Sequence, residues 1–89
     1  MVKKEITIQN SSGLHARPAA SLVKLASRFT SKIYLQKDGL EVNAKSIMGV
    51  MTLAAEKGSK ILIIANGKDE GEALKQIFEL IESKFGEKK

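Results

Sequence analysis

The chain has a single histidine, His15, and an arginine stands two residues after it. The residues from about 16 onward follow a helical pattern, so His15 falls at the N-cap or the first position of a helix. Backbone N–H groups at that point have no partner within the helix, and they bind anions together with the positive end of the helix dipole. Arg17 adds planar donors that suit phosphate oxygens. Because a neutral imidazole is also a nucleophile, these residues favour acceptance of a phosphoryl group at His15.

The residues around His15 favour a carrier over an enzyme. Pro18 lies in the first turn of the helix, where its missing N–H costs nothing, and Gly13 lets the preceding loop turn close to the histidine. The chain offers no second histidine, no serine–histidine–aspartate triad, no phosphate-binding loop and no paired carboxylates. The ring can therefore accept and donate a phosphoryl group, but it has no second base for turnover. The alternative is a surface histidine without a function.

Length and composition predict one domain over residues 1–89 with an aliphatic core, since 43% of the residues are hydrophobic and 4% are aromatic. The absence of cysteine and the single histidine argue against a metal site, and we expect no cofactor. The first residues lead straight into an alternating pattern, so we expect no signal peptide, and no apolar run approaches the roughly 20 residues of a membrane-spanning helix. We therefore expect a soluble, cytoplasmic protein without membrane insertion. The net charge of +5 favours acidic partners, although the basic residues are scattered.

Hydrophobic periodicity predicts the element order β-α-β-β-α-β-α. The strands are expected at residues 2–8, 31–36, 40–44 and 60–65, and the helices at 16–29, 47–55 and about 70–85. Asp69 and Glu72 fit a capping box for the last helix, and Asp38-Gly39 predicts a hairpin turn. The natural packing is a mostly antiparallel sheet covered on one face by helices. The strand order stays open, because a ferredoxin-like sheet gives nearly the same pattern. The apolar stripe of the last helix is expected to comprise Leu74, Ile77, Phe78, Ile81 and Phe85.

A second segment combines a helix cap with a surplus of apolar residues. Ser46 is expected to cap the helix that follows it. One apolar arc of this helix holds Val50, Leu53 and Ala54, and an adjacent arc holds Ile47, Met48 and Met51. Because one sheet face does not easily bury both arcs, we interpret the second as an exposed docking patch for a partner; core methionines are the alternative. We expect the patch beside His15, flanked by Arg17, Ala20 and Lys24. In the first helix, one basic line opposite the core is expected to hold Arg17, Lys24 and Arg28.

Two segments carry a resemblance to a known family. Residues 13–19 (GLHARPA) resemble the active-site signature of HPr, the histidine-containing phosphocarrier family of the bacterial phosphoenolpyruvate:sugar phosphotransferase system. Residues 45–51 (KSIMGVM) resemble the regulatory serine segment of the family's Gram-positive type, and the similarity runs through nearly the whole chain. The resemblance implies an α+β fold, an open-faced β-sandwich with a four-stranded antiparallel sheet and three helices on one face. It also leads us to expect a monomer.

The resemblance further implies a phosphocarrier that is not itself an enzyme. His15 would receive the phosphoryl group on Nδ1 from enzyme I, itself charged by phosphoenolpyruvate, and would pass it to the IIA domains of sugar permeases. Arg17 would act beside His15, and the residues expected to support the phosphate are Ser12, Ala16 and Pro18.

The resemblance also implies regulation at Ser46. An ATP-dependent HPr kinase/phosphorylase would phosphorylate this serine, and the product would bind the repressor CcpA in carbon catabolite repression. A phosphate there adds about two negative charges beside a surface meant for an acidic partner, which should weaken docking. The chain departs from Gram-positive relatives at Thr52 and at Ala54-Ala55, where they often have Ser and Leu-Gly, and this bears on how the helix ends.

Two alternatives stay open. The first is a paralogue dedicated to regulation or to nitrogen-type phosphotransfer, although the intact His15 and Arg17 argue against a form that has lost the histidine. The second is a small basic nucleic-acid-binding domain, which needs basic or aromatic residues on the open sheet face. Lys32, Tyr34 and Gln36 give thin support for it, so we expect no direct contact with nucleic acid.

Overall fold

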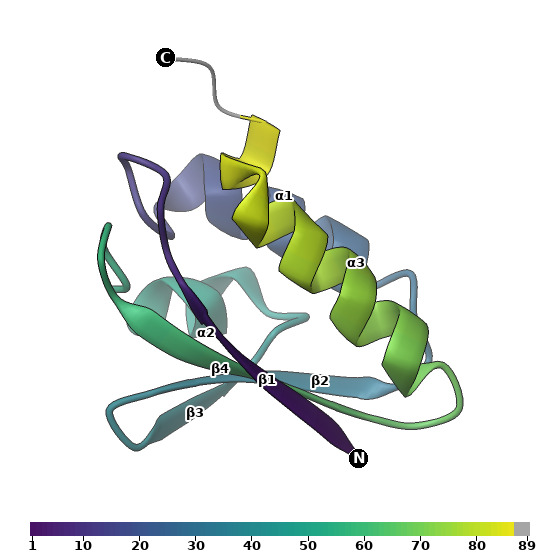
Figure 1. The fold of residues 1–89 in the computed structure, drawn as a ribbon. Helices are drawn as coiled ribbons and strands as arrows, with labels where there is room; N and C mark the ends of the chain where they lie inside the picture. Colours follow the sequence, from purple (N-terminus) through teal and green to yellow (C-terminus); the bar gives the residue numbers. More distant parts are fainter. Residues whose placement is uncertain (87–89) are drawn as a thin grey trace.

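The computed structural model describes residues 1–86 and has the predicted order of elements (Figure 1). The strands are β1 (Val2–Thr7), β2 (Lys32–Lys37), β3 (Leu40–Asn43) and β4 (Lys60–Asn66). The helices are α1 (Ala16–Ala26), α2 (Ile47–Thr52) and α3 (Glu70–Glu82), and a short 3-10 turn, η1 (Lys84–Gly86), follows α3.

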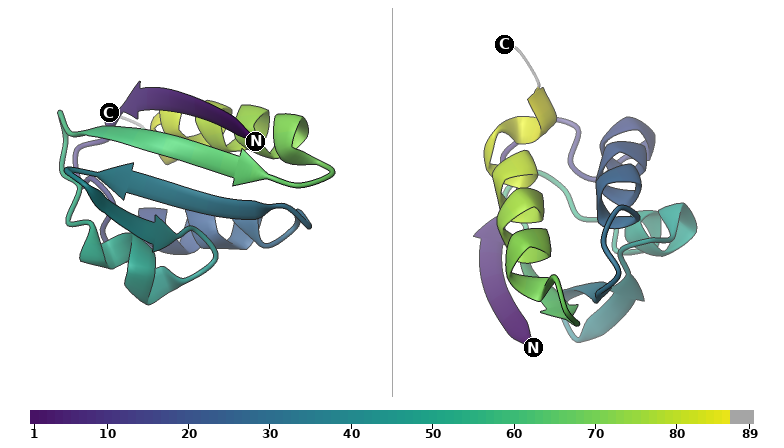
Figure 2. Two further views of the ribbon diagram at one scale, coloured as in Figure 1. Left: turned by 90° about the horizontal axis from the view of Figure 1, so that it is seen from below. Right: turned by 90° about the vertical axis from the view of Figure 1, so that its right-hand side faces the viewer.

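The four strands form one antiparallel sheet in the order β1-β4-β2-β3. The three helices lie on one face of this sheet, and the other face is open (Figures 1 and 2). The predicted open-faced sandwich is therefore confirmed, and the strand order is now fixed by β4, which pairs with β1 on one side and β2 on the other. Lys37 pairs with Leu40 across the two-residue turn at Asp38-Gly39, where both residues have positive φ, as the sequence predicted.

The apolar run of β4 is buried on both sides of the sheet except at Leu62, which is half-buried, and the two sides are covered differently. Ile61, Ile63 and Ala65 face the helices and form the core with them. Ile64 points to the open face and is nevertheless only 6% exposed. Its cross-strand partners are Lys3 and Tyr34, whose long side chains are near enough to cover it.

The first two helices, α1 and α2, both end earlier than predicted. After α1, the amides of Arg28 and Phe29 bond three residues back, to Leu25 and Ala26, so the chain tightens into a 3-10-like turn. The Phe29 carbonyl then accepts a hydrogen bond of 2.7 Å from Lys45 Nζ. The predicted helix over 16–29 is therefore three residues too long, and Arg28 does not continue the basic line of α1.

Helix α2 ends at Thr52 rather than near residue 55, because Ala54 takes the left-handed conformation with φ of 51°. Left-handed φ is incompatible with continuing an α-helix, and it costs a residue with a Cβ about 1–2 kcal/mol. As a result Ala54 is exposed, whereas Val50, Leu53 and Ala55 are buried. The prediction that Ala54 belongs to the buried arc of this helix is wrong for that reason.

The predicted capping box of α3 is also wrong. Asp69 occupies the N-cap position, but its side chain does not cap the helix. Its carboxylate accepts hydrogen bonds from the Ser31 hydroxyl and from the amides of Thr30 and Ser31, which begin the turn into β2. Glu72, the expected partner in the box, instead accepts a hydrogen bond of 2.7 Å from Gln76. Asp69 therefore ties the start of α3 to the loop before β2, and these bonds, led by that from the hydroxyl, lower its pKa to about 2.

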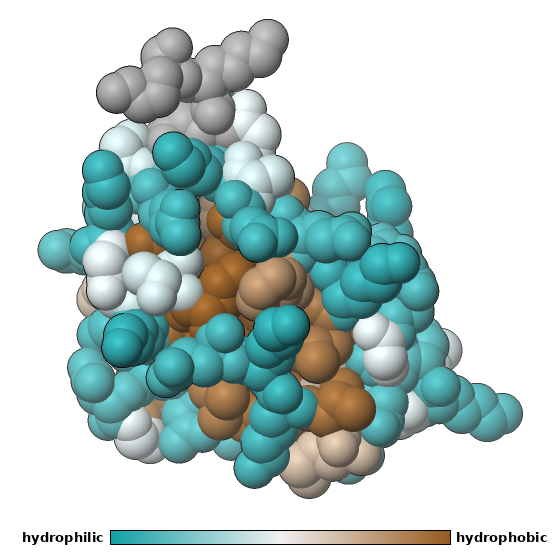
Figure 3. All heavy atoms as spheres, viewed as in Figure 1, coloured by the Kyte–Doolittle hydropathy of each residue, from teal (hydrophilic) through white to brown (hydrophobic). Residues whose placement is uncertain are grey.

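Helix α3 packs along β1, and a band of apolar surface is visible between them (Figure 3). Leu74 and Phe78 are half-buried there, and Lys4 Nζ lies 4.4 Å from the centroid of the Phe78 ring. Phe85 is not part of the α3 stripe as predicted, since the helix ends at Glu82 and Phe85 has φ of 57°. It packs against the same core from η1 instead.

The loop between β1 and α1 is held by a close approach of two backbones. Gly13 has φ of 64°, and a Cβ built there would lie 2.8 Å from Glu56 Cα and closer still to the Ala55 carbonyl oxygen. The next residue, Leu14, donates a hydrogen bond of 2.8 Å to that carbonyl. Only glycine combines this conformation with this contact, so Gly13 fixes where α1 begins relative to the end of α2.

The bonds of Asp69 make the stability depend on pH. We expect Asp69→Asn to lower the free energy of unfolding near neutral pH. Because the pKa of Asp69 is about 2 in the folded protein and about 4 in an unfolded chain, this stabilisation is complete above about pH 4 and is lost as the pH falls toward 2. Urea unfolding should show the gap between wild type and variant narrowing over that range. Glu72→Gln is the control for the charge; a gap independent of pH would contradict the prediction.

The stability effect of the close backbone contact at Gly13 can be measured separately from the effect of its positive φ. Gly39 also has positive φ, but a Cβ there would have nothing within 4 Å. We expect Gly39→Ala to cost about 1 kcal/mol of stability and Gly13→Ala to cost about 1–3 kcal/mol more, because the added methyl is forced against backbone. Denaturant unfolding of both variants measures the difference. Equal losses would show that backbone conformation alone requires glycine at position 13.

Candidate functional site

His15 is the N-cap residue of α1 and is exposed to solvent. Its backbone is extended, its carbonyl accepts the first bond of the helix from Ala19, and its side chain does not cap the helix. The amides of Ala16 and Arg17 have no intrahelical acceptor by their position, and Pro18 has no N–H. Within residues 1–86 the imidazole makes no hydrogen bond, and it lies beside two amides without an intrahelical acceptor and the positive end of the dipole of an 11-residue helix.

One hollow beside His15 holds the residues that the sequence assigned to phosphate. We call it the Arg17 hollow; it is lined by Asn10, Ser12, His15, Ala16, Arg17, Pro18, Ser21, Lys84, Phe85 and Gly86. The structure therefore brings His15 and Arg17 together with the three residues expected to support a phosphate. It also adds Lys84 and Phe85 from the turn after α3, which sequence reasoning missed because nothing in the local pattern links residues so far apart in the chain.

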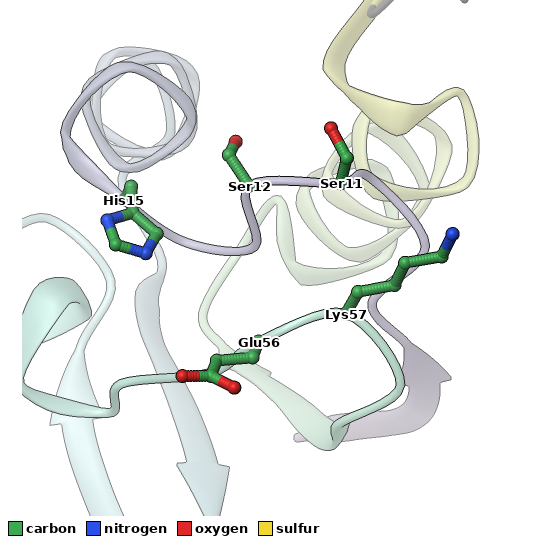
Figure 4. A pocket seen from close by; sticks show the side chains of 5 residues that line it. All are labelled: Ser11, Ser12, His15, Glu56 and Lys57. Carbon is green, nitrogen blue, oxygen red and sulfur yellow. The ribbon is translucent and has the colours of Figure 1, made fainter.

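A second hollow borders His15 on the side of the loop after α2. We call it the Glu56 hollow; it is lined by Ser11, Ser12, His15, Glu56 and Lys57 (Figure 4). The Glu56 side chain extends toward the His15 side of this hollow, and the Lys57 side chain extends the opposite way (Figure 4). One acidic and one basic side chain therefore line this hollow, with the acidic one on the side of the histidine, whereas both charged side chains of the other hollow are basic.

Asn10 supports the loop that carries His15. It is only 1% exposed, and its Nδ2 donates a hydrogen bond of 2.8 Å to the Gly13 carbonyl and one of 3.3 Å to Ser12 Oγ. Its Oδ1 is buried and has no hydrogen-bond partner within residues 1–86. The sequence shows only a polar loop here, and no local signal distinguishes Asn10 from its neighbours.

The predicted docking patch is exposed. Met48 is 77% exposed, Ile47 45% and Met51 40%, so the alternative that these methionines belong to the core is wrong. Helices α1 and α2 contact each other. Met51 also lines a small hollow together with Leu14, His15 and Glu56, which connects the patch to the histidine. Ala20 and Lys24 are exposed on α1.

Ser46 caps α2, as the sequence predicted. Its Oγ accepts a hydrogen bond of 3.0 Å from the Gly49 amide, and its backbone is extended. The loop before it is fixed by Asn43, whose side chain accepts from the Lys45 amide and whose carbonyl accepts from the Ser46 amide. The hydroxyl is thus at the helix start, half-buried, and already used as an acceptor.

Other kinds of site find little support. On the open sheet face Tyr34 and Gln36 are half-buried. The register places Glu41 beside Gln36 and places Glu5 in the same row, on the far side of Leu62, which disfavours nucleic acid. Within residues 1–86, no group of three or more histidine, cysteine or acidic side chains is arranged to hold a metal ion. The helices of this part of the chain are all too short or too polar to cross a bilayer.

Comparisons with known proteins agree with this arrangement. The family model described as "PTS HPr component phosphorylation site" matches residues 2–83. The phosphocarrier protein HPr of Treponema pallidum is 52% identical over 98% of this chain and 99% of its own length. HPr-like protein Crh of Halalkalibacterium halodurans is 51% identical over 92% of this chain and 98% of its own. The crystal structure of HPr-C-His from Thermoanaerobacter tengcongensis, 52% identical, covers the whole of both chains with a TM-score of 0.97. The chain belongs to the HPr family of the phosphotransferase system.

Proposed function

We propose that this chain is a phosphocarrier in which His15 accepts a phosphoryl group from phospho-enzyme I and passes it to IIA domains of sugar permeases. The observation that carries the proposal is the exposed imidazole at the start of α1, in one hollow with Arg17 and next to two unsatisfied amides. We further propose that residues 1–89 form a single cytoplasmic domain that needs no cofactor.

The chemistry follows from the free ring. The lone pair of a ring nitrogen, Nδ1 in the family, attacks the phosphorus of the phosphorylated donor. A nitrogen–phosphorus bond forms while the donor's bond to phosphorus breaks, and that bond's electron pair stays with the donor. Transfer to the acceptor is the same step with the roles exchanged, so no second base is required. Arg17 and the amides of Ala16 and Arg17 balance the charge of the phosphoryl oxygens, with Ser12 and Pro18 shaping the hollow.

The docking patch supports the choice of partners. Exposed apolar groups next to an exposed histidine suit a protein surface that must be bound and released quickly. Lys24 and Arg17 beside the patch favour acidic surfaces. The proposed site uses residues of one chain, so we propose that the monomer is the working form, although relatives of 46–53% identity include a dimer of HPr and a swapped dimer of Crh.

Ser46 is the proposed regulatory site. Phosphorylation by an HPr kinase/phosphorylase would add about two negative charges at a helix start, where the dipole tolerates them, but close to the docking patch. This would weaken binding of acidic partners without unfolding the helix, and the phosphorylated form would be the one that binds CcpA. Such a regulatory role is supported by the similarity to Crh, the Bacillus subtilis catabolite repression HPr, whose solution structure is 48% identical. His15 and Arg17 favour a carrier that is also regulated over a form that only regulates.

The carrier function is tested by phosphorylation in solution. Incubated with enzyme I and phosphoenolpyruvate, the wild type should gain the mass of one phosphoryl group, and His15→Ala should gain none. The adduct should be lost in acid, because a nitrogen–phosphorus bond is acid-labile. Omission of enzyme I is the control, and a wild type that gains no mass would overturn the proposal.

The docking role of the Ser46 region is tested by two substitutions at this residue. Ser46→Asp places a charge at the cap, so we expect its affinity for enzyme I to fall about five- to tenfold while its melting temperature stays the same or rises slightly. Ser46→Ala loses the bond to Gly49 and should be less stable by about 1 kcal/mol, with unchanged affinity. Titration calorimetry and thermal unfolding separate the two effects. Equal affinities of all three proteins would contradict a docking surface at this position.

A further inference from the structure

A second cation from a distant part of the chain lines the Arg17 hollow. Lys84 belongs to η1, after α3, and it shares this hollow with His15, Ser12 and Arg17. Figures 1 and 2 show the end of α3 and the start of α1 at the same end of the molecule. The lysine is half-buried. The structure gives its ammonium group no hydrogen bond or ion pair to any residue of 1–86, so its charge is available.

The backbone around Lys84 is held in an unusual conformation. Lys84 and Phe85 are consecutive residues with φ of 59° and 57°, although neither is glycine. Such left-handed residues cost free energy and persist where the surroundings hold them. Phe85 packs against the hydrophobic core, and the Gly86 amide bonds back to the Ser83 carbonyl. These contacts hold Lys84 beside the hollow. If α3 continued past Glu82, we would expect the lysine to extend from the helix into solvent instead.

The charges on the two sides of His15 favour this hollow for a phosphate. A phosphoryl group on the ring carries about two negative charges. On one side it would face Glu56, which repels it, and on the other it would meet Arg17 and Lys84, which attract it. The hydroxyl groups of Ser12 and Ser21 also line this hollow and are acceptors suited to a lysine donor.

We propose that Lys84 is a second phosphate-binding cation, which together with Arg17 holds the oxygens of the phosphoryl group on His15 in the Arg17 hollow. This inference rests on the proposed function for the phosphorylated state, but the hollow can also bind a free phosphate anion. In the phosphorylated protein, the three donors of the ammonium are shared between phosphoryl oxygens and the hollow's acceptors. Lys84 thus stabilises the charged form of the carrier and does not take part in bond breaking.

The matched variants are Lys84→Gln and Lys57→Gln. Both remove one positive charge from a lysine that lines a hollow at His15, but Lys57 extends away from the ring on the Glu56 side (Figure 4). Inorganic phosphate is titrated into each unphosphorylated protein and followed by the NMR signals of the His15 ring. We expect Lys84→Gln to weaken phosphate binding about three- to tenfold, Lys57→Gln to leave it nearly unchanged, and Lys84→Arg to restore it.

The phosphorylated proteins provide an independent measurement. The phosphorus chemical shift of phosphohistidine and the equilibrium of phosphoryl transfer from enzyme I should change in Lys84→Gln and not in Lys57→Gln, while both variants melt as the wild type does. If both variants behave alike in transfer and in phosphate binding, Lys84 has no such role, and the carrier function still stands. If the wild type is never phosphorylated, the carrier function fails, and the phosphate titration alone decides whether Lys84 binds the anion.

Discussion

The site depends on the close approach of Gly13 to the backbone of Ala55 and Glu56. This contact, with the hydrogen bond from Leu14 to the Ala55 carbonyl, fixes the first residue of α1 against the loop that leaves α2. The Asn10 side chain holds the same loop from within. Because His15 follows Leu14 directly, its position relative to the docking patch and to Glu56 is set by backbone and not by the histidine's own side chain, which remains free for chemistry.

The charged side chains around His15 differ between its two sides. Arg17 comes from the first turn of α1, Lys84 from the turn after α3, and Glu56 from the loop after α2. The side of His15 that holds Arg17 and Lys84 is therefore the more favourable one for an anionic group. The apolar patch on α2 reaches the histidine through Met51, so a partner docked on the proposed surface would have its own reacting group close to the ring. The proposed carrier would therefore need few residues of its own, because the partner would supply the other half of the reaction.

Much of the site could be read from the sequence, because its central residues are neighbours in the chain. The spacing of His15, Arg17 and Pro18 at a helix start indicates an anion site, and Ser46 indicates a cap, by local rules. Other local rules were outweighed by tertiary contacts. Asp69 fits a capping box, but its carboxylate finds three donors in the loop before β2. Phe85 fits the stripe of α3, yet the chain turns out of the helix before reaching it and packs the ring from another direction.

The sequence by itself determined the order of elements, most of each apolar face, and the place of His15 and Arg17 at a helix start, because periodicity and caps depend on residues a few positions apart. Only the tertiary structure decided which strands are neighbours, where α1 and α2 stop, and that Glu56, Lys84 and Asn10 surround the histidine. These depend on contacts between distant segments, such as the insertion of β4 between β1 and β2. The charge on each side of His15 is therefore a property of the fold, whereas the histidine's place at the helix start is a property of the sequence.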